Sequence, residues 1–188
     1  MEPVDGYILA GGKSSRFGSD KARAELDGRS LLLRQIDATE LVCARVTVVV
    51  DRIGRYADLD VREIADRRPG GGPMSGLDAA LHDSTTEWLL VLSCDLTHFD
   101  PAWLDDLLKS RSAEADAAAF HHNDRWEPLC AIYHRRLISV VDERLRSGDR
   151  SLQDLLNSVA ATKRPMPSNW PSVAQVNTPD DLDRARAR

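Results

Sequence analysis

Short apolar runs alternate along this chain with longer stretches of helical periodicity. Most of the runs are β-branched or apolar at nearly every position, which is typical of strands covered on both faces of a parallel sheet. The runs predict strands over residues 7–10, 46–50, 61–64, 88–92, 115–120, 129–133 and 173–176.

Between these runs, apolar residues recur every three or four positions, as on the buried face of a helix. The spacing predicts helices over residues 30–39, 73–82, 101–108, 137–145 and 152–159, and a last helix from 179. Two of these helices begin with a capping side chain followed by proline, at Asp100 and at Thr178. Residues 163–171 contain three prolines and predict a surface loop before the last strand.

Strands that alternate with helices predict an α/β fold, a three-layer doubly wound and mainly parallel sheet of the Rossmann-like kind. In such sheets ligands bind beyond the carboxyl ends of the strands. The loops that follow Ala10, Ile64 and Leu92 all fall at that edge. With 188 residues we expect one domain, residues 1–188.

Composition and charge narrow the classes of partner. The net charge of −5 predicts no broad cationic surface for nucleic acid, and no apolar run is long enough to predict a membrane span. The acidic N-terminal residues do not resemble a signal peptide, so we expect a cytoplasmic protein. The three cysteines, Cys43, Cys94 and Cys130, lack the spacing of a zinc site and predict reduced, mostly buried thiols.

The loop after the first strand carries most of the chemical information. Residues 11–21 read Gly-Gly-Lys-Ser-Ser-Arg-Phe-Gly-Ser-Asp-Lys, and we call them the phosphate loop. Glycine lets backbone N–H groups approach an anion, serine adds donors, and Arg16 and Lys21 supply positive charge. Neither the Walker loop nor the dinucleotide fingerprint fits this spacing. The alternative is a solvated loop between a strand and a helix, and Lys13 is better read as a solvated charge.

The pattern Leu-Ala-Gly-Gly-x-Ser-x-Arg-x-Gly-x-Asp-Lys over residues 9–21 resembles the signature loop of nucleoside-triphosphate transferases. It is most similar to that of molybdenum cofactor guanylyltransferases, the MobA-like nucleotidyltransferase family, and the resemblance extends from Val4 to about Leu182. The resemblance implies that GTP is bound by Leu9, Ala10, Gly11, Gly12, Lys21, Asp66, Gly72, Gly76 and Asp95. It also implies that Lys21, Arg16 and Asp95 are the catalytic residues.

Asp95 directly follows the buried strand 88–92. A carboxylate at the carboxyl end of a core strand is well placed for Mg²⁺, which needs one or two carboxylates besides phosphate oxygens. The alternative is an aspartate that caps a turn. In the family resembled, the metal-binding aspartate lies in a Cys-Asp-x-Pro stretch, where this chain has Cys94-Asp95 but Thr97 in place of proline.

Residues 66–76 join a strand to a helix through a run of glycines. The resemblance matches Gly72, Pro73 and Gly76 to an element that lines the base and ribose. It matches Asp66 to an aspartate of the nucleotide pocket, where a carboxylate can accept two N–H groups from guanine but not from cytosine. The alternative is that Asp66 pairs with Arg67 and Arg68 at the surface.

The later segments resemble the family more weakly. Glu127–Tyr133 matches a strand on the acceptor side, and Asn177 either orders Asp95 and its metal or only ends a strand. His121 and His122 are adjacent on a strand and point to opposite faces, so they predict a polar hairpin and not a metal site.

The function implied is Mg²⁺-dependent transfer of GMP from GTP to the terminal phosphate of molybdopterin, with release of pyrophosphate. Two alternatives stay open: a cytidylyltransferase that acts on the same cofactor, and a non-catalytic nucleotide or cofactor carrier. GTP and molybdopterin are the expected partners. Transient contact with molybdoenzymes or cofactor-insertion chaperones is expected from the resemblance alone.

Overall fold

The computed structural model describes residues 3–12 and 17–187. Seven strands form one sheet in the order β5-β4-β1-β6-β8-β7-β9, and β8 alone runs antiparallel to its neighbours. The strands of this sheet are β1 (Asp5–Leu9), β4 (Arg45–Val50), β5 (Glu63–Ala65), β6 (Trp88–Ser93), β7 (Ala117–His122), β8 (Arg125–His134) and β9 (Ala161–Pro165).

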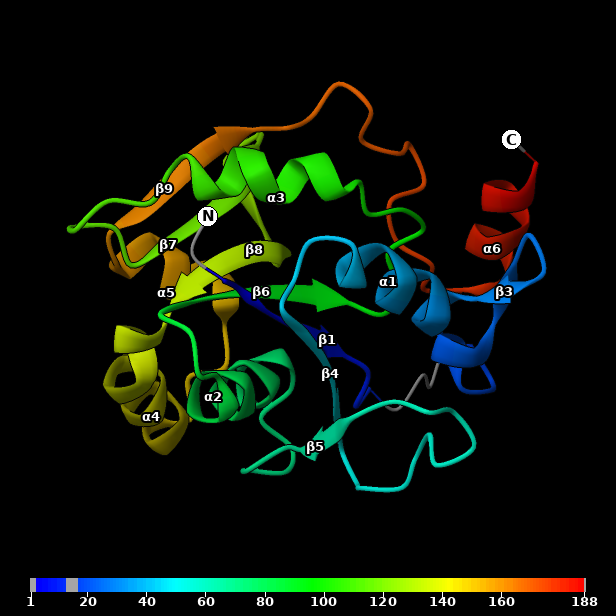
Figure 1. Ribbon diagram of the computed structural model, residues 1–188, viewed down its shortest axis with the longest axis horizontal. Helices are drawn as coiled ribbons and strands as arrows, with labels where there is room; N and C mark the ends of the chain where they lie inside the picture. Colours follow the sequence, from blue (N-terminus) through cyan, green and yellow to red (C-terminus); the bar gives the residue numbers. More distant parts are fainter. Residues whose placement is uncertain (1–2, 13–16, 188) are drawn as a thin grey trace.

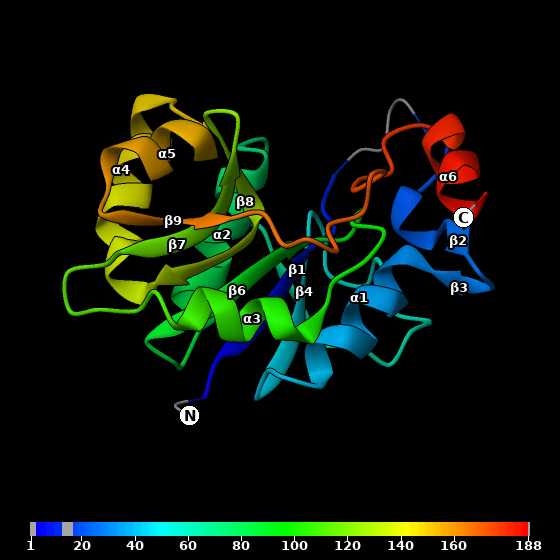
Figure 2. The same ribbon diagram turned by 90° about the horizontal axis from the view of Figure 1, so that it is seen from above.

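Helices cover both faces of the sheet (Figures 1 and 2). Leu32 and Leu104, from α1 and α3, lie in the core on one face, whereas Leu77, Val141 and Leu155, from α2, α4 and α5, lie in the core on the other. The helices are α1 (Leu31–Glu40), α2 (Pro73–Asp83), α3 (Pro101–Leu108), α4 (Ile138–Ser147), α5 (Leu152–Ser158) and α6 (Pro179–Arg186), with short 3-10 turns η1 (Lys21–Arg23) and η2 (Arg135–Leu137). The predicted three-layer, mainly parallel α/β fold is confirmed.

The predicted helix starts are confirmed in atomic detail. The carboxylate of Asp100 accepts a hydrogen bond from the amide of Ala102, and Thr178 and Asp181 form a reciprocal capping box at the start of α6. Each cap satisfies amides that the helix itself cannot bond. The polar hairpin at His121 and His122 is also confirmed, because β7 turns into β8 there.

The predicted last strand, residues 173–176, is wrong. Both edges of β6 are already paired, with β1 and β8, so this segment cannot join the sheet beside it. It runs instead along the residues that follow β6, with one bridge between Leu96 and Gln175 and a hydrogen bond from the amide of Val176 to the carbonyl of Asp95.

The sheet is completed by β9, in a stretch that the sequence placed partly in a loop. β9 is an edge strand parallel to β7, and its residues Ala-Thr-Lys-Arg-Pro carry no apolar alternation. Edge strands are commonly polar and tolerate proline because one side has no pairing partner. The stretch therefore lacks the pattern by which buried strands are found.

A small lobe lies beside α1 at one end of the sheet. It contains α6 and the two-stranded hairpin of β2 (Glu25–Leu26) and β3 (Arg29–Ser30), with Leu26, Leu31, Val176 and Leu182 as its core (Figure 2). Asp27 and Gly28 form the hairpin turn with positive φ angles of 54° and 76°. An Asp-Gly pair adopts this turn readily.

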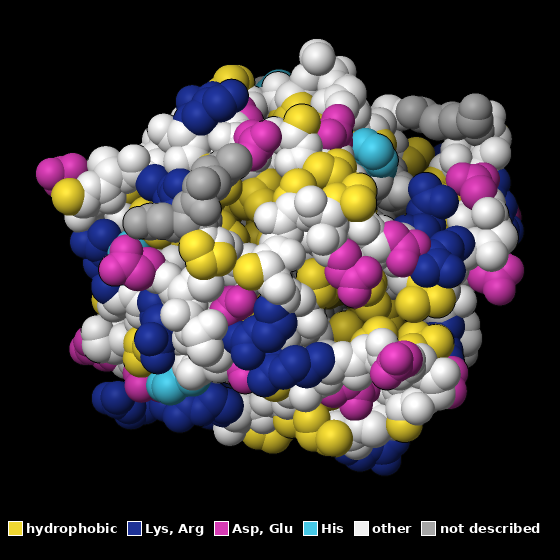
Figure 3. Space-filling model, viewed as in Figure 1, with side chains coloured by type: hydrophobic (Ala, Val, Ile, Leu, Met, Phe, Trp, Pro, Cys, Tyr) yellow, Lys and Arg dark blue, Asp and Glu magenta, His cyan; other side chains and the backbone are white. Residues whose placement is uncertain are grey.

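Charged side chains of both signs are interspersed on the face drawn in Figure 3. Among the residues that the structure describes, no helix is both long enough and apolar enough to cross a bilayer.

Candidate functional site

The site lies where the carboxyl ends of β5, β4, β1 and β6 meet. The register pairs Leu9 with Val49 and Ser93, and Val50 with Ala65, so these strands end side by side. After β1 the chain forms β4 on one side of it, and later it forms β6 on the other side. This edge is therefore the topological switch point of the sheet, the usual place for a ligand in a doubly wound fold.

Lys21 and Asp95 contact each other across this edge. Lys21 is the first residue of η1, and its ammonium donates to the carboxylate of Asp95. The two side chains are 19% and 8% exposed, so the pair is largely shielded from water. Residues that are 74 positions apart in the sequence are thus brought together, as the sequence predicted for a shared site.

Asp95 is held from several directions. The hydroxyl of Ser93 donates to its second carboxylate oxygen, and the amide of Val176 donates to its backbone carbonyl. Just before it, the amide of Cys94 donates to the carbonyl of Leu9 at 3.2 Å. The carboxylate is therefore fixed relative to the end of β1, where the phosphate loop begins.

The carboxylate of Asp95, buried at the ligand-binding edge, has the oxygen chemistry that the predicted Mg²⁺ requires. In this structure its two oxygens accept from the Lys21 ammonium and the Ser93 hydroxyl, so a bound metal would share or displace the contact with Lys21. Asn177 adds an amide oxygen nearby, 3.4 Å from the Lys21 nitrogen. Its contact is with Lys21, so it lies beside the pair, and it does not end a strand because residues 173–176 do not form one.

At two of the predicted GTP positions there is little room for a side chain. A Cβ on Gly11 would lie 3.0 Å from the backbone nitrogen of Asp51, and a Cβ on Gly76 would lie 2.9 Å from the side chain of Leu9. Gly11 therefore lets the end of β1 pack against β4, and Gly76 lets α2 pack against β1. Gly72 has φ +61°, and it caps the N-terminus of α2 without a side chain.

Asp66 follows β5 at the same edge, and its amide donates to the carbonyl of Val50. Burial, together with the charges of Asp51 and Asp78, raises the pKa of its carboxyl to about 6. Within the described ranges its carboxylate has no ion-pair partner. The alternative of a surface pair with Arg67 and Arg68 is wrong.

The two arginines instead form ion pairs that connect the loop after Asp66 to α2 and α4. Arg67 lies 3.2 Å from the fully buried carboxylate of Asp78 on α2, and Arg68 lies 2.6 Å from Asp142 on α4. Asp78, His82 and Asp142 place potential metal-ligand atoms within 4.8 Å of one another. The Arg67 guanidinium lies among them, 2.7 Å from a ring nitrogen of His82, so a cation already neutralises this cluster.

Two predicted residues of the phosphate loop, Lys13 and Arg16, lie outside the described residues. Arg55 and Tyr56, which follow β4, were not predicted as site residues. Arg55 contacts Gly12 and Asp20 of this loop, and the Tyr56 hydroxyl contacts Asp20 and the carbonyl of Ala10, just before the loop. No apolar periodicity or motif marks residues 51–60, so the only signal was their place after a strand at the ligand-binding edge.

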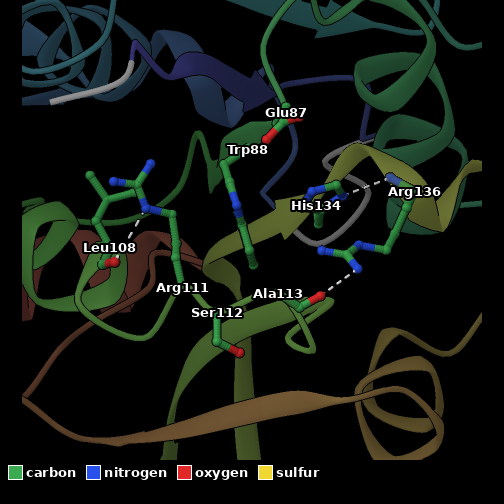
Figure 4. A pocket seen from close by; sticks show the side chains of 8 residues that line it. All are labelled: Glu87, Trp88, Leu108, Arg111, Ser112, Ala113, His134 and Arg136. Carbon is green, nitrogen blue, oxygen red and sulfur yellow. Dashed lines mark hydrogen bonds between the residues drawn. The ribbon is translucent and has the colours of Figure 1, made fainter.

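Two adjoining cavities of about 390 and 380 Å³ lie at the opposite edge of the sheet. They share Glu87, His134 and Arg136, and Figure 4 shows these side chains around the larger one. The Arg136 guanidinium donates to the carbonyl of Ala113 at 2.7 Å. Trp88, at the amino end of β6, lines the larger cavity, whereas Asp95 follows the carboxyl end, so neither cavity belongs to the site described above.

Known proteins resemble this chain in both sequence and fold. A probable molybdenum cofactor guanylyltransferase from Opitutus terrae is 34% identical over 97% of the chain and 95% of its own length. Another from Deinococcus radiodurans is 37% identical over 81% of the chain and 79% of its own length.

A solved structure, molybdopterin-guanine dinucleotide biosynthesis protein A from Archaeoglobus fulgidus, has a TM-score of 0.84 at 23% identity and covers 98% of the chain and 97% of its own. At that identity the likeness shows the fold. Residues 6–164 match the model of the MobA-like NTP transferase domain. This chain therefore belongs to the MobA-like NTP transferase family.

Proposed function

We propose that this protein transfers GMP from GTP to the terminal phosphate of molybdopterin and releases pyrophosphate. The observation that carries the proposal is the Lys21–Asp95 pair, a part-buried cation at the end of the phosphate loop in contact with a buried carboxylate that follows β6. The curated relatives described above are named for this activity, and they align with nearly the whole chain or most of it.

The reaction requires positioning and charge stabilisation. An oxygen of the molybdopterin phosphate attacks the α-phosphorus of GTP, and a new P–O bond forms. The bond from that phosphorus to the oxygen bridging the α- and β-phosphates breaks, and its electron pair leaves with pyrophosphate. A phosphate is ionised at neutral pH, so the acceptor needs no general base.

Lys21 is the residue that we assign to the developing charge. Its ammonium is held by Asp95 in a largely dry position, where an electrostatic interaction is stronger than in water. The loop amides from Gly11 onward and Arg16 are assigned to the phosphates. Asp95 would hold Mg²⁺, which when bound neutralises phosphate charge.

Asp66 is the residue that we assign to the guanine base. Its half-buried carboxylate is not ion-paired with Arg67 or Arg68, so it can accept hydrogen bonds from N1–H and the amino group of guanine. Gly72, at the N-cap of α2, has no atom of the described residues near the position of a Cβ and so leaves room for the ribose and base, whereas Gly76 packs against Leu9 and sets the position of α2.

Pyrophosphate release from each nucleoside triphosphate, measured with Mg²⁺ and molybdenum-loaded molybdopterin, tests the proposal. Release that requires both GTP and the cofactor supports it. Release from CTP alone would instead indicate a cytidylyltransferase. GTP binding without release from any of the four nucleotides would indicate a carrier.

A further inference from the structure

The connection between β4 and β5 contains a residue that touches the phosphate loop at two places. Arg55 donates through Nη2 to the carbonyl of Gly12 at 3.1 Å and through Nε to the carboxylate of Asp20 at 3.1 Å. Its Nη1 donates to Asp51 at 2.9 Å. Gly12 lies near the start of the phosphate loop and Asp20 near its end, so one guanidinium joins the two.

Asp20 links Arg55 to the turn that contains Lys21. One oxygen of its carboxylate accepts the amide of Ala22 at 3.1 Å and so caps η1, the turn that begins at Lys21. The other oxygen accepts from Arg55 and from the buried hydroxyl of Tyr56 at 3.1 Å. The position of η1, and with it the backbone of Lys21, is therefore set by residues that follow β4.

Arg55 is itself held in place. Its side chain is only 17% exposed and lies over the ring of Tyr56, which is completely buried. The carboxylate of Glu63, in β5, accepts the amides of Gly54 and Tyr56 at 2.5 and 2.7 Å. The guanidinium is thus presented by a turn that is hydrogen-bonded to β5, an edge strand of the sheet. Figure 1 shows the course of this connection between β4 and β5.

We propose that Arg55 is a positioning residue that joins Gly12 to Asp20 and fixes Lys21 opposite Asp95 before the nucleotide binds. A guanidinium presents its N–H groups in a rigid planar fork, so it can join three acceptors that one ammonium cannot reach together. Holding Gly12 and Asp20 in place beforehand removes the entropic cost of ordering them from nucleotide binding. This inference rests on the proposed function for the identity of the nucleotide.

The first test needs no nucleotide and uses hydrogen exchange of the amides in residues 17–24. Arg55→Ala is expected to speed this exchange by about tenfold or more, because Asp20 and the start of η1 lose their anchor. Arg52→Ala is the matched control, since it removes the same charge from an exposed position of the same connection. Exchange at the wild-type rate in Arg55→Ala would overturn the proposal.

The second test measures GTP affinity by titration calorimetry. Arg55→Ala is expected to weaken binding by about 10- to 100-fold, and Arg55→Lys is expected to recover little of it. Full recovery by lysine would show that charge suffices and would overturn the fork geometry. Weakened binding with unchanged exchange would also overturn it, because Arg55 would then act on the nucleotide directly.

A double-mutant cycle with Asp20→Ala provides a further check. The two residues share one contact and each has others, so the loss of GTP affinity in the double variant should be clearly smaller than the product of the two single losses. Independent losses that multiply would contradict the proposal. Thermal unfolding shows whether each variant folds, and Arg55→Lys serves in the exchange test if Arg55→Ala does not. If wild type releases no pyrophosphate, the proposed function fails while the exchange result still decides the role of Arg55.

Discussion

Replacing Asp66 by asparagine is expected to weaken GTP binding and to stabilise the fold. Burial raises the pKa of the Asp66 carboxyl from 3.8 to about 6, and Asp51 and Asp78 contribute in the same direction. The folded protein therefore disfavours the ionised carboxylate that guanine recognition needs. A residue kept for binding at the expense of stability is common in functional sites.

The magnitude follows from the pKa difference. At about 1.36 kcal/mol per pH unit, a rise from 3.8 to about 6 corresponds to about 3 kcal/mol. The side chain is half exposed and screened by water, so we expect a gain of about 1 kcal/mol in the free energy of unfolding. Because the folded pKa is the higher one, the destabilisation is absent below pH 3.8, builds up to about pH 6 and is complete above it.

Chemical denaturation at pH 8 and pH 4 tests the stability half of this reasoning. Asp66→Asn should be more stable than wild type at pH 8 and equal to it at pH 4. Asp60→Asn removes an exposed carboxylate nearby in the chain and serves as the control, with no change expected at either pH. Equal stability of Asp66→Asn and wild type at pH 8 would refute the reasoning.

Titration calorimetry with GTP tests the binding half. An asparagine amide can accept only one of the two guanine N–H groups and sets its own N–H against the other, so affinity should fall about 10- to 100-fold. In wild type, affinity should fall as the pH drops below about 6, where the carboxylate becomes protonated. Unchanged GTP affinity in Asp66→Asn would remove Asp66 from the guanine site.

Four further outcomes are expected. Lys21→Ala should keep its circular dichroism spectrum but lose about 100- to 1,000-fold in pyrophosphate release, and a loss below threefold would contradict its assigned role. Gly11→Ala should lower the denaturant midpoint, because its Cβ would lie 3.0 Å from a backbone atom. Gly12→Ala is the control and should leave the midpoint unchanged, because its Cβ would meet no atom of the described residues within 4 Å. Equal midpoints for the two variants would contradict the packing argument. Asp5→Asn should lose about 1–3 kcal/mol of stability at pH 7, measured by denaturation. Burial alone would raise the pKa of Asp5, but hydrogen bonds from the Thr85 amide and Arg45 outweigh it, and the net pKa is lowered below 3.8. This contribution is therefore present above pH 3.8 and is lost as the pH falls through the lowered pKa, and an equal loss at pH 2 would contradict it. Chelation by EDTA should abolish pyrophosphate release and Mg²⁺ should restore it, and release that persists in EDTA would refute the assignment of Mg²⁺.

The sequence could predict those parts of the site that depend on strand ends. Asp95 and the phosphate loop each follow an unmistakable apolar run, and parallel strands end at one edge, so their meeting was predictable. The same reasoning placed Asp66 at that edge. The sequence could not identify the ion-pair partner of Arg67. Asp66 is adjacent in the chain, whereas the actual partner, Asp78, lies on α2.

The parts that could not be predicted depend on contacts between distant polar residues. Arg55 reaches a carbonyl 43 positions away in the chain, and nothing in its local pattern distinguishes it from Arg52. Residues 173–176 are as apolar as a strand, yet they pair beyond the end of β6 because its edges are occupied. The edge strand β9 was missed for the opposite reason, since it is polar.

The most direct test of the proposed function uses GTP with a radioactive phosphorus at either the α- or the γ-phosphate and follows that label into the products. With Mg²⁺ and molybdenum-loaded molybdopterin, label at the α-phosphate should appear in a cofactor dinucleotide, and label at the γ-phosphate should appear only in pyrophosphate. That result would establish transfer of GMP with cleavage between the α- and β-phosphates. Label from the γ-phosphate in the cofactor, or α-label that remains in GTP or in free GMP, would contradict the account.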